Sequence, residues 1–291
     1  MEITELLKKV RKIEIKSRKI VDNLFMGEYH SAFKGSGIEF SEVREYQYGD
    51  DIRSIDWKVT SRMNSPYVKV YHEERELTVY IILDLSTSMF FATRNQLKRD
   101  IATELAAIFS FSAISNNDKV GLITFSDKVD TYIKPSKGKK HALKIIREII
   151  NFEPKEFCQN TQLDQALEFL NDIQKKKSII FLISDFFATK YNKQLKYVSR
   201  KHDLVPVILQ DPVEVNFPKS GHLNFVDLEN NKTQVINTNS KNWNNWISNR
   251  CAKRNSQLDK LFKEAKIKPL LINTAKPYLH EMVQYFEGRK R

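Results

Sequence analysis

Two short strings of the sequence place oxygen-bearing side chains directly after apolar, strand-like runs. The first run leads into Asp84, Ser86 and Ser88, and a second run, much later in the chain, leads into Asp185. Apolar runs rich in β-branched residues are typical of strands buried on both faces of a parallel sheet. Open α/β sheets bind their ligands at the carboxyl ends of such strands. We therefore expect both acidic side chains at one rim of a sheet.

The chemistry expected at this rim is that of a hard metal ion. Asp84 and Asp185 can balance a divalent charge, and Ser86, Ser88 and Thr161 add neutral hydroxyl groups. Oxygen ligands without Cys or His select Mg²⁺, Mn²⁺ or Ca²⁺ over Zn²⁺. Because the hydroxyl ligands are uncharged, such a metal stays electrophilic and can attract a carboxylate from outside. The alternative is that the two serines only cap a turn or helix.

The pattern along the chain predicts the elements that position these residues. Strands are expected near 78–83, 120–125, 130–134, 178–184, 204–209, 223–227, 234–236 and 267–272, and helices near 95–116, 139–151, 162–176, 190–200, 240–265 and 276–287. This alternation predicts an α/β fold with a doubly wound, mainly parallel, Rossmann-like sheet. Residues 1–30 are expected to be helical and 31–72 to form loops and short strands. We divide the chain into an N-terminal helical and loop extension, 1–76, and an α/β domain, 77–291.

The three metal-site segments resemble the metal-ion-dependent adhesion site of von Willebrand factor A domains. The match rests on Asp84, Ser86 and Ser88 after the first strand, Thr161 before a helix and Asp185 after a later strand. The resemblance implies that both serines coordinate the metal directly, while the acids and the threonine do so directly or through water. It also implies a short antiparallel strand at the sheet edge, for which 130–134 is the candidate.

A second resemblance lies between residues 35 and 62. Its charged and aromatic positions are Arg44, Tyr46, Asp50, Asp51, Arg53, Asp56, Trp57 and Arg62. They resemble the signature of bacterial domain-of-unknown-function family fifty-eight, whose members join it to a von Willebrand factor A-like domain. Because genes of this family typically neighbour a MoxR-type AAA+ ATPase, the resemblance implies such an ATPase as partner. No reaction is established for the family.

The charges of this signature can pair with one another. The arginines are Arg44, Arg53 and Arg62, the acids are Glu39, Asp50, Asp51 and Asp56, and Tyr46, Tyr48 and Trp57 can cover such pairs. Three interpretations stay open. The signature is a structural clasp that fixes the extension to the α/β core, a docking surface for the ATPase, or a second metal site on Asp50 and Asp51.

Composition and charge limit the setting. The chain has 291 residues and a formal net charge of +12, with many cations between Arg250 and Arg291. These cations form either solvated helix faces or a surface for nucleic acid, anionic lipid or an acidic protein. No RNA-binding signature accompanies them, so nucleic acid is not expected. The two cysteines show no framework spacing, no signal peptide or apolar span is seen, and we expect a cytoplasmic protein.

Two functions are consistent with these residues. The first is a non-enzymatic, metal-dependent adaptor that binds an acidic group on a client protein, which a MoxR-type ATPase remodels or delivers. The second is a Mg²⁺-dependent phosphoesterase or nuclease that uses Asp84 and Asp185 as metal ligands. An enzyme needs a further acid, or a His or Lys base, near the rim. Asp127 and Asp164 are candidates without a predicted place, and we expect the adaptor.

Overall fold

The computed structural model describes residues 3–22, 29, 32–33, 39–63, 65–72, 76–91, 96–153, 161–188, 190–215, 217–226 and 233–289. These residues form two compact units. One unit comprises Met1–Ala32 and Thr78–Arg291, and the other comprises Phe33–Leu77. The first 32 residues therefore group with the α/β core, whereas the sequence analysis placed them with the signature in a single extension.

A sheet of six strands forms the centre of the larger unit. Its strands are β3 (Thr78–Asp84), β4 (Lys119–Phe125), β5 (Val129–Ser136), β6 (Ile179–Ser184), β7 (Asp203–Gln210) and β10 (Leu270–Asn273). Their order is β10-β7-β6-β3-β4-β5. All neighbours are parallel except β5, which is antiparallel to β4 at one edge. The predicted mainly parallel α/β sheet and its antiparallel edge strand are thus confirmed.

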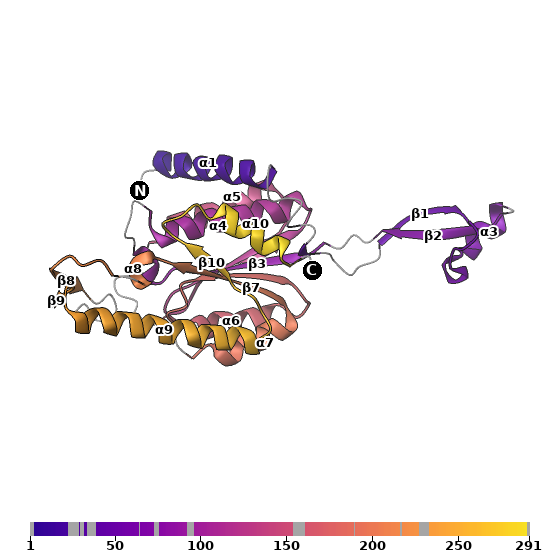
Figure 1. The fold of residues 1–291 in the computed structure, drawn as a ribbon. Helices are drawn as coiled ribbons and strands as arrows, with labels where there is room; N and C mark the ends of the chain where they lie inside the picture. Colours follow the sequence, from indigo (N-terminus) through magenta and orange to yellow (C-terminus); the bar gives the residue numbers. More distant parts are fainter. Residues whose placement is uncertain are drawn as a thin grey trace. The chain divides into compact units, whose positions relative to one another are not determined.

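Helices cover both faces of this sheet, as a doubly wound arrangement requires (Figure 1). One face carries α4 (Lys98–Ser115), α5 (Lys139–Asn151) and α10 (Leu279–Glu287), with α1 (Ile3–Ile20) packed on α4 and α5. The other carries α6 (Leu163–Ile173), α7 (Asn192–Lys201) and α9 (Lys241–Glu264). Shorter elements are the 3₁₀ helix Thr87–Phe90, α8 (Pro212–Val215) and the hairpin of β8 (His222–Val226) and β9 (Thr233–Asn237).

Burial explains both the central strands and the position of α1. All residues of β3 after Thr78, and all residues of β6, are buried, as expected of strands covered on both faces. Most residues of α4 are also buried, because the sheet covers one side of this helix and α1 covers another. Phe109 of α4 stacks on Phe181 of β6 with ring centroids 4.0 Å apart. The helix that follows Asp84 is therefore firmly held over the sheet.

The smaller unit is built on one antiparallel strand pair. It contains β1 (Glu39–Glu45), the 3₁₀ helix Ile52–Ser54, α3 (Trp57–Met63) and β2 (Tyr67–His72). Val43 lies opposite Lys69 in the pair, so the short strands expected between residues 31 and 72 are present. In both units, every helix of the described ranges is too short or too polar to span a lipid bilayer.

Candidate functional site

Asp84 and Asp185 meet at the centre of the sheet. Asp84 is the last residue of β3, and Asp185 directly follows β6. The two strands are parallel neighbours, with Leu83 opposite Ile183. The chain continues from β3 to β4 on one side and returns to β6 on the other, so this is the point where the strand order reverses. Both carboxylates are 1% exposed, and ligands of open α/β sheets bind at such a point.

Serine residues surround the carboxylate of Asp84. Its Oδ1 accepts a hydrogen bond from the Ser86 amide at 2.9 Å, and its Oδ2 accepts one from Ser184 Oγ at 2.6 Å. The hydroxyl oxygens of Ser86 and Ser88 lie 3.1 Å apart. Ser86 precedes the 3₁₀ helix Thr87–Phe90, but its side chain makes no capping hydrogen bond. The capping alternative therefore does not account for the Ser86 hydroxyl group.

Thr161 lies in a loop that is anchored beside the neighbouring strand β4. It is half-buried in the loop before α6, where the amide of the next residue, Gln162, donates to the Ser126 carbonyl at 2.8 Å. This bond ties the loop to the end of β4, a neighbour of β3 in the sheet. Within the described residues, no hydrogen bond joins the Thr161 hydroxyl to Asp84 or the serines.

Two charged residues that the sequence analysis did not predict belong to the site. Lys98, the first residue of α4, donates from Nζ to Asp185 Oδ2 at 2.9 Å and also pairs with the Glu214 carboxylate of α8. Lys98 is 1% exposed. Burial lowers the pKa of its amine, but the carboxylates of Asp185 and Glu214 outweigh that effect and raise the pKa overall. Lys98 is therefore a buried ammonium ion.

Helix α9 holds the loop that carries Asp185. Arg254 of α9 donates through Nη2 to the backbone carbonyl of Asp185, and its guanidinium group lies 3.9 Å from the ring centroid of Phe187. The amide of Phe187 donates to Asp185 Oδ1 at 3.3 Å. Each carboxylate oxygen of Asp185 thus has one donor and keeps room for another contact.

The surroundings of Asp84 disfavour the ionised form of its carboxylate. Burial, followed by repulsion from Asp185, raises the pKa of Asp84 to about 7. A cation next to Asp84 would counter both effects. The oxygen atoms of Asp84, Ser86, Ser88 and Asp185 fit the ligand preference of Mg²⁺, Mn²⁺ or Ca²⁺.

Two observations limit that fit. Lys98 already supplies a positive charge to Asp185, so a metal ion must share this carboxylate with Lys98 or displace the ammonium group. In addition, the part of the chain that the structure describes holds no group of three or more His, Cys, Asp or Glu side chains suited to a metal. The hydroxyl groups are therefore indispensable to any metal site here.

The acidic residues of the signature make local bonds within the smaller unit. Arg44 forms two hydrogen bonds of 2.7 Å with Asp50, which also accepts from the Gln47 amide at 2.8 Å. Asp51 accepts from the Arg53 amide at 3.0 Å and so begins the 3₁₀ helix. Asp56 accepts hydrogen bonds from the amides of Lys58 and Val59 and forms an ion pair with Lys69. These bonds favour a structural role over a second metal site on Asp50 and Asp51.

The prediction that aromatic side chains cover these ion pairs is wrong for Tyr48 and Trp57. Tyr48 is fully exposed and Trp57 is 68% exposed. The bidentate hydrogen bonds between the Arg44 guanidinium group and the Asp50 carboxylate form without such aromatic cover. Arg53 and Arg62 are also exposed, and neither forms an ion pair with a described residue. Ile52 and Met63 of the same unit are exposed as well.

The fold and site define an α/β protein with a mostly parallel sheet and a buried acidic centre at the carboxyl ends of two neighbouring strands. Residues 42–257 match the family described as "Protein of unknown function DUF58", and the chain belongs to this family. An uncharacterized protein of Mycobacterium bovis is 24% identical over 283 residues, which cover 97% of this chain and 89% of the relative. An uncharacterized protein of Mycobacterium tuberculosis matches to the same extent.

Solved structures show more distant similarity. Proximal thread matrix protein 1 from the mussel byssus is 14% identical, with a TM-score of 0.38, and the match covers 46% of this chain and 37% of that one. An uncharacterized membrane-spanning protein from Vibrio fischeri is 13% identical, with a TM-score of 0.26, and the match covers 72% of this chain and 98% of that one. Scores this low add nothing to the account of the fold.

Proposed function

We propose that the α/β unit is a metal-dependent adaptor that binds an acidic group of a client protein. Asp84, Ser86, Ser88 and Asp185 would hold a divalent cation, Mg²⁺ or alternatively Mn²⁺ or Ca²⁺, with Thr161 contributing through water. When bound, the metal supplies a positive centre that attracts a client carboxylate. The observation that carries this proposal is the meeting of two buried carboxylates and two facing hydroxyl groups at the ends of β3 and β6.

Lys98 determines how tightly such a metal binds. The three carboxylates of Asp84, Asp185 and Glu214 outnumber the ammonium group of Lys98, so negative charge remains when all three are ionised. This excess favours binding of a cation. Because Lys98 occupies one oxygen of Asp185, however, it competes with the metal at that carboxylate.

A specific observation also favours the hydrolase alternative. Lys98 and Glu214 bring an amine and a further acid beside Asp185, the kinds of group that metal-dependent phosphoesterases and nucleases need. Against this alternative, the two groups pair with each other, and the raised pKa of Lys98 keeps its amine protonated. Neither group is then free to accept a proton, so the adaptor is the better supported function.

We assign contact with the proposed MoxR-type ATPase to the smaller unit. Its side chains Tyr48, Ile52, Trp57 and Met63 are large, apolar and exposed, and a protein partner could bury them. A pull-down with the ATPase tests this assignment. Trp57→Ser should abolish capture, while exchange of Trp246, an exposed tryptophan of the α/β unit, for Ser should leave it intact. Equal capture by the Trp57 variant would contradict the assignment.

Calorimetric titration of Mg²⁺ and Mn²⁺ tests the metal site. Saturable binding is expected for the wild type and its loss for Asp84→Ala, with Asp259→Ala, an exposed acid on α9, as the matched control. No binding by the wild type would refute the metal site. A parallel screen with phosphate esters and nucleic acid separates the two functions, since turnover that depends on Mg²⁺ and on Asp84 would establish the enzyme.

A further inference from the structure

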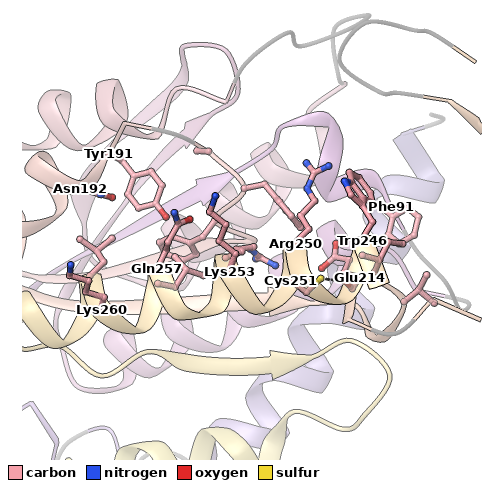
Figure 2. Close-up of a pocket in the computed structure, with 18 of the residues that line it drawn as sticks. Phe91, Tyr191, Asn192, Glu214, Trp246, Arg250, Cys251, Lys253, Gln257 and Lys260 are labelled. Carbon is pink, nitrogen blue, oxygen red and sulfur yellow. Dashed lines mark hydrogen bonds between the residues drawn. The ribbon is translucent and has the colours of Figure 1, made fainter. Parts of the chain in front are cut away.

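A pocket of about 910 Å³ lies next to the acidic centre, within the α/β unit (Figure 2). One wall is a face of α9, on which Trp246, Arg250, Lys253, Gln257 and Lys260 recur at helical spacing. The opposite wall comes from the segment after β6, the start of α7 and α8. The volume is typical of cavities that enclose a ligand, since such cavities measure roughly 300–1,000 Å³.

The lining of this pocket combines aromatic rings with positive charge. The aromatic residues include Phe186, Phe187, Phe217, Phe225, Trp243 and Trp246, and the cations are Lys190, Arg250, Lys253, Arg254 and Lys260. Its two acids are already paired, Glu214 with Lys98 and Glu264 with Lys196 at 2.5 Å. The chemistry that fits is an anionic ligand with apolar groups.

Most of these cations have no ionic partner in the described residues. Lys190, Arg250, Lys253 and Lys260 form no ion pair there. Arg254 keeps two buried nitrogens, Nε and Nη1, without a hydrogen-bond partner in the same residues. Buried donors without partners are rare in native proteins, so an anion bound beside Arg254 would satisfy groups that the described chain leaves unsatisfied.

The arrangement of the rings favours a peptide over a nucleic acid. Trp243 stacks on Trp246 with centroids 5.2 Å apart, and the guanidinium group of Arg250 lies 5.2 Å from the Trp246 centroid. Arg254 covers the ring of Phe187. Nucleobases bind such grooves by stacking on free ring faces, and these faces already have partners. Aliphatic or aromatic side chains can instead pack against the ring edges.

The pocket is continuous with the proposed metal site. Phe186 and Phe187, which follow Asp185 directly, line it, and so does Glu214, the partner of Lys98. We propose that the pocket binds a client segment in which acidic side chains alternate with aliphatic or aromatic ones. This inference rests on the proposed function, because the segment belongs to the client whose carboxylate the rim would take.

Tryptophan fluorescence can report on this pocket. The chain has three tryptophans, of which Trp243 and Trp246 line the pocket, so Trp57→Phe leaves only these two. The probe is a short, end-blocked peptide of alternating Glu and Leu, which has no fluorescence of its own in this range. Matched peptides replace Glu by Gln or Leu by Ser, and an oligothymidylate of similar length represents nucleic acid.

We expect a saturable fluorescence change with the Glu-Leu peptide and a much weaker one with either matched peptide. Exchange of the exposed Arg250 and Lys253 for Glu should weaken binding about tenfold or more, because both charges face the ligand. Lys263→Glu makes the same kind of change on α9 outside the pocket and should alter binding by about twofold at most. Circular dichroism confirms that each variant is folded.

The outcomes separate this inference from the metal site. Peptide binding that persists in EDTA and in Asp84→Ala, yet is lost with the Arg250 and Lys253 exchange, supports the pocket while the metal dependence fails. Normal Mg²⁺ binding without any saturable peptide signal overturns the pocket alone. Tighter binding of the oligothymidylate, or an equal loss in Lys263→Glu, also overturns it.

Discussion

Lys98 Nζ lies 2.9 Å from Asp185 Oδ2, and each of these side chains is only 1% exposed. The pair connects the start of α4 to the end of β6, across the carboxyl end of β3. A single ammonium group thus stands where the sequence predicts only a metal ion. Lys98 therefore balances the charge of Asp185 when no divalent cation is bound, and it competes with such a cation for this carboxylate.

Lys98→Met should destabilise the protein without metal and increase its response to metal. Removing one partner of a buried ion pair leaves an uncompensated charge and costs about 3–5 kcal/mol. The melting temperature in EDTA should therefore fall, while added Mg²⁺ should raise it more than in the wild type. Scanning calorimetry with and without Mg²⁺ measures both effects. An unchanged melting temperature in EDTA would show that Lys98 does not balance Asp185.

Ser86→Ala and Ser88→Ala should weaken metal binding and preserve the fold. Neither change removes an apolar contact, and the Ser86 side chain makes no capping bond, so we expect a loss of about 1 kcal/mol or less in stability. Calorimetric titration of Mg²⁺ measures the affinity, and urea unfolding in EDTA measures the stability. If either variant unfolds readily in metal-free buffer, the hydroxyl group has a structural role instead.

The division of the chain into units can be tested on α1. Ile20 is 7% exposed and Ile15 is 61% exposed on the same helix. Ile20→Asp buries a charge against the α/β core and should cost about 2–4 kcal/mol of unfolding free energy. Ile15→Asp is the matched control and should change it by about 0.5 kcal/mol or less. Urea titrations compare the two, and equal effects would show that α1 does not belong to the core.

Stability should decrease below neutral pH because of His202. Burial lowers the pKa of His202 to about 4, and Lys201 contributes in the same direction. The unfolded chain therefore binds a proton that the folded chain excludes between pH 6.5 and about 4. Stability from this residue is complete above pH 6.5 and falls as the pH decreases through that window, by about 2–3 kcal/mol.

Urea unfolding at a series of pH values measures this loss. His202→Gln should flatten the dependence below pH 6.5, whereas substitution of the exposed His222 by Gln should leave it unchanged. A loss of stability below pH 6.5 that survives in the His202 variant would contradict this assignment, because the raised pKa of Asp84 acts in the opposite direction.

The sequence predicted the positions of Asp84 and Asp185 because strand ends can be located locally. Each acid follows an uninterrupted apolar run, and parallel strands place their carboxyl ends together. Lys98 and Glu214 were not predicted as site residues. Their contact joins residues far apart in sequence, and a lysine at the start of a helix is normally exposed. No local pattern marks such a residue as buried.

The packing of α1 and the exposure of Trp57 also depend on contacts between residues far apart in sequence. The spacing of apolar residues in α1 predicts a helix with one buried face, but it does not indicate which surface covers that face, so the sequence alone could not group this helix with the α/β unit. Likewise, the charges of the signature predict pairing, and Arg44 does bind Asp50. Whether Trp57 covers that pair depends on packing that no sequence period encodes.

Glu214 belongs both to the acidic centre and to the pocket beside α9. Its carboxylate holds the Lys98 ammonium group, and its side chain also forms part of the pocket beside α9. Any pocket ligand that displaces the Glu214 carboxylate would break its ion pair with Lys98. The change in the position of Lys98 would then alter the affinity of Asp185 for a cation. Thermodynamic linkage makes such an effect reciprocal: the cation must then alter retention of the occupant by the same factor.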